Sequence, residues 1–166
     1  MRTSSVALAA ALAVVSITTS LSGQKPDPAI DPRSMQLLEQ GRAQKAAGNF
    51  DGATDSLETA VAVDPRNRAA FVALAEVAEA RDLPGKAIRL YREALLLEPN
   101  DLAALRGQGE ALVAKGAIVR ARANLAKIRT LCKTGCADAT ALAAVIAKGP
   151  PITTAAVVTK PATAKE

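Results

Sequence analysis

Small and apolar residues recur along the middle of the chain at intervals of three and four positions. They do so at Phe71, Leu74, Ala75 and Ala78, and again at Ala87, Leu90, Tyr91 and Ala94. An i, i+3, i+4, i+7 spacing places such residues on one side of an α-helix. Pro84 suits the first turn of the second helix, Pro99 ends it, and Asp101 can cap the next one. The pattern therefore predicts a pair of antiparallel helices.

The same order of residue types returns 34 positions earlier and 34 positions later. Moving Ala87, Tyr91, Ala94 and Pro99 back by 34 gives Ala53, Leu57, Ala60 and Pro65, and moving the first three forward gives Ala121, Leu125 and Ile128. A lone pair of short helices would leave apolar flanks in water, and stacked identical pairs cover them. The repeat thus predicts an all-α fold of three helix-turn-helix units, at about residues 34–67, 68–101 and 102–135.

These residues resemble the tetratricopeptide repeat family over residues 34–131. The matches are Leu37, Gly41, Ala53, Leu57, Ala60 and Pro65, then Phe71, Leu74, Ala75, Ala78, Ala87, Tyr91, Ala94 and Pro99, and finally Leu105, Gly109, Leu112, Ala121, Leu125 and Ile128. The resemblance implies a short right-handed α-solenoid. Polar side chains stand at positions where an apolar residue is more usual, namely Gln40, Gln44, Gln108 and Asn124.

The third unit lacks the expected proline, because that position falls on Lys133. Gly135 can take the left-handed conformation that ends a helix, and a further pattern follows over residues 137–148. Its apolar stripe consists of Leu142, Val145 and Ile146, and Gly149 with Pro150 stops it. We expect this segment to be a capping helix that covers the open end of the stack.

Cys132 and Cys136 flank the turn before that helix, and three kinds of site use such a pair of cysteines. In an exported protein a disulfide is favoured, and closing a loop of five residues contributes about 2 kcal/mol in the chain-entropy model. A thiol oxidoreductase has two residues between its cysteines, whereas this chain has three. A zinc site needs more ligands than two thiolates without histidine can supply. We therefore predict a structural disulfide and no metal site.

Both ends of the chain differ in composition from the repeats. Residues 1–23 combine Arg2, an apolar stretch from Val6 to Ile17 and small residues before Gln24, as in a signal peptide cleaved after Ser22 or Gly23. About 12 apolar residues are too few to span a bilayer, which needs about 20. Residues 24–33 are expected to form a flexible tether, and residues 149–166 a disordered tail rich in Pro, Thr and Ala. We expect export to the periplasm or cell envelope, without stable membrane insertion after cleavage.

Composition excludes most catalytic chemistry. The 166 residues include no histidine and no tryptophan, so the commonest general base and the Ser-His and Cys-His nucleophile pairs are missing. We therefore expect neither an enzyme nor a cofactor. The net charge of +5 is mild and names no specific partner.

Basic residues gather without any acidic residue between Lys115 and Lys133. We define the basic patch as Arg120, Arg122, Lys127 and Arg129. A solvated outer face of the last repeat helix is the simpler interpretation, and binding of anionic envelope polymers or an acidic protein is the alternative. Nucleic acid is not an expected partner, because aromatic residues that stack on bases are lacking.

In the family that the chain resembles, the first helix of each unit lines the concave side. The matching groove residues here are Met35, Leu38, Arg42, Lys45, Val72, Glu76, Glu79, Arg106, Glu110 and Val113, with Ala69 and Ala103 at further positions. Basic groups stand at one end and acidic groups in the middle, which suits a peptide or helix of complementary charge. The lysine and asparagine clamp that holds a C-terminal carboxylate in some members is not matched, since Leu38 and Arg42 occupy its positions in the first unit.

Two hypotheses about function follow. The first is a non-catalytic protein-protein interaction module, a scaffold or adaptor in the bacterial cell envelope that holds a peptide or helix of another protein in the groove. The second is a structural subunit that self-associates, or joins an envelope complex, through end-to-end stacking of repeats. The two differ in the size of the particle in solution, which light scattering measures.

Overall fold

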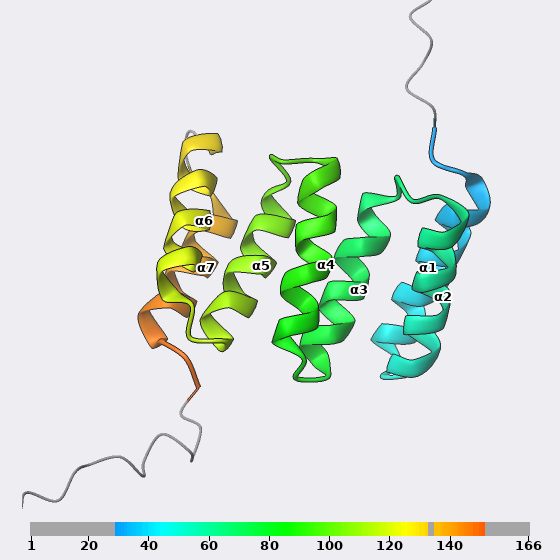
Figure 1. The fold of residues 1–166 in the computed structure, drawn as a ribbon, viewed down its shortest axis with the longest axis horizontal. Helices are drawn as coiled ribbons and strands as arrows, with labels where there is room; N and C mark the ends of the chain where they lie inside the picture. The colour runs from blue at the N-terminus through cyan, green and yellow to red at the C-terminus, as the bar shows by residue number, and fades with distance from the viewer. Residues whose placement is uncertain (1–28, 133–134, 152–166) are drawn as a thin grey trace, which may run out of the picture.

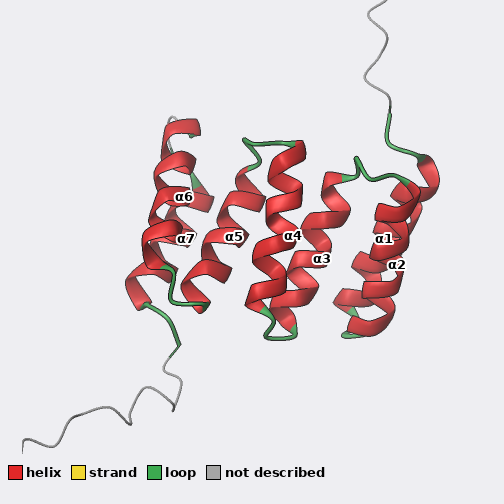
Figure 2. Ribbon diagram, in the orientation of Figure 1, coloured by secondary structure: helices red, strands yellow, loops and turns green. Residues whose placement is uncertain are grey.

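The computed structural model describes residues 29–132 and 135–151, and over these ranges the chain consists of α-helices and loops (Figures 1 and 2). The helices are α1 (Pro32–Ala46), α2 (Phe50–Val63), α3 (Arg68–Ala80), α4 (Pro84–Leu97), α5 (Leu102–Ala114), α6 (Ile118–Leu131) and α7 (Ala137–Lys148). They match the three predicted pairs and the predicted capping helix. The proposed signal peptide, most of the tether and most of the tail lie outside the described residues.

The first helix begins slightly earlier than the sequence pattern suggested. It starts at Pro32 rather than at Ser34, because the Asp31 carboxylate accepts a hydrogen bond of 2.7 Å from the Arg33 backbone N–H. Proline at the first helical position also has the backbone angle that a helix needs. The predicted tether is therefore wrong by two residues at its end.

The helices stand side by side from the α1–α2 pair at one end of the molecule to α6 and α7 at the other (Figure 1). Within each unit the two helices pack along their length, and each second helix also contacts the first helix of the next unit. The first helices α1, α3, α5 and α7 pack against their neighbours in this series, whereas the backbones of α2, α4 and α6 do not come close to one another. The stack therefore curves, with the first helices on its inner side. We call the surface that they form the inner face.

Small residues bring the helices close enough to exclude water. A Cβ atom on Gly41 would lie 2.5 Å from a side-chain carbon of Leu57, and one on Gly109 would lie 2.6 Å from Leu142. Ala87 is fully buried, in a cluster that joins α3, α4 and α5. Since larger residues at these positions would separate the helices, the choice of glycine and alanine sets the spacing of the stack.

Buried polar side chains fix the joint between the first two units. The Asn67 carbonyl caps α3 by accepting from the Ala70 N–H, and its amide donates to the Ser34 hydroxyl at 2.8 Å. That hydroxyl donates in turn to the Ala60 carbonyl at 2.7 Å. Ser34 and Asn67 are almost fully buried, so each needs these partners to avoid the penalty of an unpaired polar group.

Asp64 completes the same joint. Its carboxylate accepts hydrogen bonds from the Arg66 guanidinium, the Asp31 N–H and the Arg66 N–H, and these donors lower its pKa to about 2. The negative charge is thus favoured in the folded protein. It ties the start of α1 to the loop between α2 and α3.

The unusual polar residues inside the repeats are paired with each other. The Ser56 hydroxyl donates to Gln44 at 2.7 Å. The Asn124 amide donates at 3.0 Å to the Leu105 carbonyl and at 3.0 Å to the Gln108 side chain. Gln44, Gln108 and Asn124 are therefore each matched by a polar residue on the facing helix, whereas Gln40 is exposed on α1, and the outer units remain packed.

The structure joins Cys132 and Cys136 by a disulfide, with 5.8 Å between their Cα atoms. Cys132 is the residue after the end of α6, and Cys136 is the residue before α7. The bridge therefore sits at the corner where the chain turns back. Beyond it α7 packs on both α5 and α6 and buries Leu142 completely, as expected for a capping helix.

Candidate functional site

Most of the predicted groove residues lie on the inner face and reach solvent. Met35 and Arg42 are exposed on α1. A further set is half-buried along α1, α3 and α5, comprising Lys45, Ala69, Val72, Glu76, Glu79, Arg106 and Glu110, and Ala103 is exposed on α5. The register taken from the repeat pattern therefore places these residues on one continuous surface.

Two predicted groove residues are instead part of the core. Leu38 is 0% exposed and packs in the cluster of the first two units. Val113 is 2% exposed and packs against α6 and α7 near Ile146. A partner on the inner face could not contact either side chain, so both predictions are wrong. The reason is that the buried stripe of a first helix is wide, since it packs against helices on both sides.

At the first end of the inner face, Lys45 of α1 forms an ion pair with Glu76 of α3. Arg42 stands one turn away and pairs with Glu39 at 2.7 Å on the same helix. The Lys45–Glu76 pair bridges neighbouring units, whereas the Arg42 pair is local and exposed. Only the first of these links fixes a charge in the middle of the face.

The centre of the face is built around Glu79 and Tyr91. The Tyr91 hydroxyl donates a hydrogen bond of 2.8 Å to the Glu79 carboxylate, from α4 to α3. The Tyr91 ring lies against Gly107 of α5, where a Cβ atom would come within 2.2 Å of a ring carbon. Glycine at this position therefore makes room for the ring. The sequence pattern placed Tyr91 in the core only, although Gly107, about half a period further on, could have indicated a close contact.

Glu79 is the most strongly perturbed acid of the face. Burial raises its pKa to about 7, and the negative charges of Glu110 and Glu76 act in the same direction. The Tyr91 hydrogen bond and the charge of Arg106 oppose the shift. Burial and the nearby carboxylates also raise the pKa of Tyr91, so its hydroxyl remains a donor at neutral pH. Glu79 therefore changes its charge near neutral pH.

Arg106 organises the far end of the face. Its guanidinium donates to Glu110 at 3.1 Å on the same helix and to Asp138 of α7 at 2.8 Å. Asp138 was not among the predicted site residues. The capping helix occupies the place of a first helix, but the 34-residue register aligns Asp138 with the fully buried Ala70 and Ala104, so periodicity alone does not place this carboxylate on the inner face.

The charges of the inner face do not balance. Four carboxylates, from Glu76, Glu79, Glu110 and Asp138, gather along its middle and far end, and the bases that pair with them are Lys45 and Arg106. Carboxylates outnumber their cationic partners, and among the described residues the hydrogen-bond donor to Glu79 is the neutral Tyr91 hydroxyl. The centre of the face therefore attracts cationic groups when Glu79 is ionised.

The predicted basic patch lies elsewhere, because Arg120, Arg122, Lys127 and Arg129 are all exposed on α6. Lys127 reaches back to the Pro99 carbonyl at 2.6 Å and so helps to join the second and third units. The patch thus belongs to the outer side and the end of the stack, away from the acidic centre.

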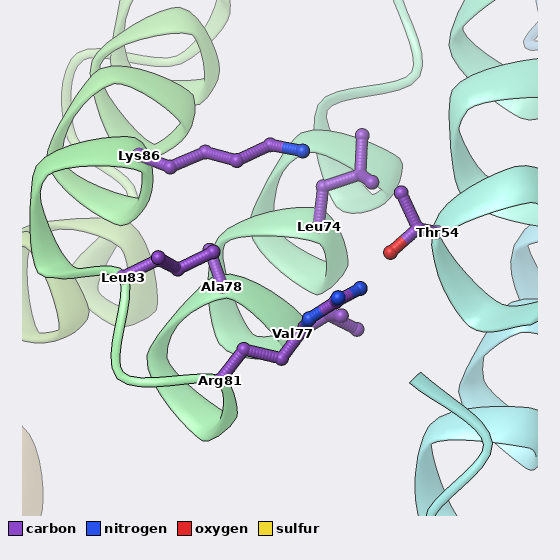
Figure 3. Close-up of a pocket in the computed structure, with 7 residues that line it drawn as sticks. All are labelled: Thr54, Leu74, Val77, Ala78, Arg81, Leu83 and Lys86. Carbon is purple, nitrogen blue, oxygen red and sulfur yellow. The ribbon is translucent and has the colours of Figure 1, made fainter. Parts of the chain in front are cut away.

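A small hollow lies between α2, α3 and α4, with a volume of about 160 Å³ (Figure 3). Leu83, just before α4, and Lys86 of α4 stand across it from Thr54 of α2. Two ion pairs also join the units here, Arg81 to Asp51 at 2.7 Å and Lys86 to Glu58 at 3.4 Å. The hollow is smaller than a typical ligand pocket of about 300 Å³ or more, and it marks a joint between units rather than a binding site.

The described residues contain no group of three or more potential metal ligands. Within the same residues, no helix is both long and apolar enough to cross a bilayer.

No protein-family model and no curated protein sequence matches the chain. Solved structures do match it. The first TPR of Spaghetti (RPAP3) bound to the HSP90 peptide SRMEEVD aligns with a TM-score of 0.65 and 20% identity, over 70% of this chain and 91% of that one. The Sgt2 TPR domain from Aspergillus fumigatus aligns with a TM-score of 0.66 and 23% identity, over 72% of this chain and 81% of that one.

A bacterial secretion chaperone is also similar. SycD of Yersinia enterocolitica, in complex with a peptide of the translocator YopD, aligns with a TM-score of 0.61 and 18% identity, over 69% of this chain and 92% of that one. These structures share the fold over about 70% of this chain. The fold of this chain is therefore that of a tetratricopeptide-repeat domain, an all-α solenoid.

Proposed function

We propose that this protein is a non-catalytic interaction module that binds a segment of another protein across the inner face. The observation that carries the proposal is the uncovered row of charged side chains on α1, α3, α5 and α7. Structures of the same fold support it, since Spaghetti (RPAP3) is bound to an HSP90 peptide and SycD to a translocator peptide.

The charges of the face select the chemistry of the segment. Carboxylates of Glu76, Glu79 and Glu110 would attract lysine or arginine side chains and repel a peptide rich in acidic residues. A peptide such as SRMEEVD, which Spaghetti (RPAP3) holds, is therefore not expected to bind here. We propose a basic segment, either extended or helical, as the partner.

The setting that we propose is the bacterial cell envelope. The support comes from the sequence of residues 1–23, which has the charged, apolar and small-residue zones of a signal peptide. Mass spectrometry of the protein from the envelope fraction should give an N-terminus at Gly23 or Gln24. A protein that retains Met1 or Arg2 would contradict export by cleavage.

Calorimetric titration tests the choice of partner. We expect a ten-residue peptide of alternating lysine and alanine to bind the full chain, and a peptide with glutamate in place of lysine not to bind. Substituting Glu76→Gln together with Glu79→Gln should lower the affinity for the lysine peptide by about tenfold, because two partly desolvated charge contacts are lost.

The matched control removes two acidic charges from second helices, by Glu58→Gln with Glu93→Gln. These substitutions change the net charge equally, so unchanged affinity shows that the inner face is responsible. Equal weakening by both pairs would refute a local site. Affinity capture from envelope extracts with residues 24–166 as bait then identifies the natural partner.

A further inference from the structure

The end of the stack carries a second surface that the proposed function does not use. We call it the C-terminal slot, a groove of about 580 Å³ between α6 and α7. Its lining residues are Arg122, Leu125, Ala126 and Arg129 from α6 and Ala143, Ile146 and Ala147 from α7. On each helix these residues are spaced by three and four positions, so each helix contributes one face to the slot.

An equivalent junction inside the stack shows what shape of partner fits. Arg122 and Ile146 follow Thr54 and Ala78 by 68 positions, which is twice the 34-residue period. Thr54 and Ala78 line the hollow between α2 and α3, where α4 lies across the gap and leaves only about 160 Å³ (Figure 3). After α7 the structure describes no such helix, and the slot is more than three times as large. Its shape therefore fits a helix.

The α2 side of the filled junction is acidic, whereas the α6 side of the slot is basic. In the filled junction the acidic Glu58 of α2 pairs with Lys86 of the covering helix. The position that corresponds to Glu58 is Ala126, and its neighbours in the slot are Arg122 and Arg129. Both arginines are exposed, and the described residues give neither of them a hydrogen-bond or ion-pair partner. They lie two helical turns apart, which is about 10 Å along α6.

From this geometry we infer that the C-terminal slot binds an acidic amphipathic helix of a partner protein. The helix places small apolar residues against Leu125, Ile146 and the alanines, and carboxylates on its flanks face Arg122 and Arg129. The chain's own residues 152–166 have the wrong charge for this place, since they contain Lys160 and Lys165 but only Glu166 as an acid. The slot lies apart from the acidic centre of the inner face, so this inference does not depend on the proposed function.

A designed peptide tests the inference on the full chain. The probe is a fluorescent 14-residue helix, the length of α4 and α6, with alanine and leucine on one face and glutamate on both flanks. We expect fluorescence anisotropy to show binding of this peptide, and no binding of a peptide with lysine at the glutamate positions. Arg122→Gln with Arg129→Gln should weaken binding by about tenfold, the effect of losing two charge pairs at the rim. Ala143→Glu should abolish it.

The matched control is Lys115→Gln with Arg120→Gln, which removes the same charge outside the slot and should leave the affinity within about twofold. Circular dichroism checks that every variant is folded. Equal binding of both peptides would overturn the inference. So would equally tight, Arg122-dependent binding of unstructured polyglutamate, which would indicate a patch for polyanions. A photo-reactive side chain at Ala126 that crosslinks to residues 152–166, or to a second copy of the chain in a dimer, would also overturn it.

Discussion

The substitution Glu79→Gln should make the protein more stable at alkaline pH. In the folded protein the pKa of Glu79 is raised to about 7 from its ordinary value of 4.5, mainly by burial and then by the carboxylates of Glu110 and Glu76. Glutamine has nearly the same shape and still accepts the hydrogen bond from Tyr91. The substitution therefore removes the cost of the buried charge and leaves the packing in place.

The direction in which Glu79 changes the stability follows from proton binding. Below pH 4.5 the Glu79 carboxyl is protonated in both the folded and the unfolded chain, so it has no effect on their balance. Between pH 4.5 and 7 the folded state keeps a proton that the unfolded state releases, and stability therefore falls as the pH rises. Above pH 7 the loss is complete. Arg106 of α5 and Tyr91 of α4 face the same carboxyl and limit the loss.

The same two pKa values give an upper limit for the change in the free energy of unfolding. A pKa that moves from 4.5 to about 7 corresponds to at most about 3 kcal/mol. Glu79 is only half-buried, so solvent screening reduces the effect to about 1–2 kcal/mol. We expect Glu79→Gln to raise the free energy of unfolding by this amount at pH 8 and to change it little at pH 4.

Urea denaturation at a series of pH values measures the effect. The matched control Glu39→Gln removes the same charge from the exposed side of α1 and should not give this gain. A difference between Glu79→Gln and the parent protein that stays constant from pH 4 to pH 8 would refute the reasoning. A less stable variant at pH 8 would do so as well.

Three further predictions concern packing and the terminal joint. Ala87→Leu should destabilise the fold by about 1–3 kcal/mol because Ala87 is fully buried, whereas Ala80→Leu on the exposed side should have little effect; equal melting temperatures would contradict the register. Gly107→Ala should lower the free energy of unfolding, measured by urea denaturation, by about 1–3 kcal/mol, since the added methyl group would meet the Tyr91 ring. Cys132→Ser with Cys136→Ser should lower stability by about 1–3 kcal/mol and speed hydrogen exchange in α7 first. Two free thiols in the exported protein, found by mass after alkylation, would exclude the bridge.

The repeat pattern predicted the fold because each unit has the same apolar positions and packs against its neighbours in the same way. Ala53, Ala87 and Ala121 are 34 positions apart. Because each unit has to cover the same apolar flanks of its neighbours, this spacing determines the helix bounds and the order in which the helices stack. The start of α1 differed because a cap depends on the Asp31 side chain, which lies outside the periodic stripe.

The inner face was predictable only in part. Periodicity gave the side of each helix, and it put Glu76 and Arg106 on the inner face. It could not give the width of the buried stripe, so Leu38 was assigned to the surface although it lies in the core. To predict the contact of Tyr91 with Glu79, one has to know how α3 and α4 are shifted along their axes relative to each other, and the sequence pattern does not contain this information.

The most direct test of the proposed function is to map where a basic peptide binds. The amide spectrum of the isotope-labelled full chain should be recorded by NMR while the lysine–alanine peptide is added. We predict that the shifts concentrate on α3 and α5 around Glu76, Glu79 and Glu110, and that they weaken as the pH is lowered from 8 to 6 while Glu79 becomes protonated. Shifts confined to α2 and α4, or no shifts at all, would contradict the proposal that the inner face binds a basic protein segment.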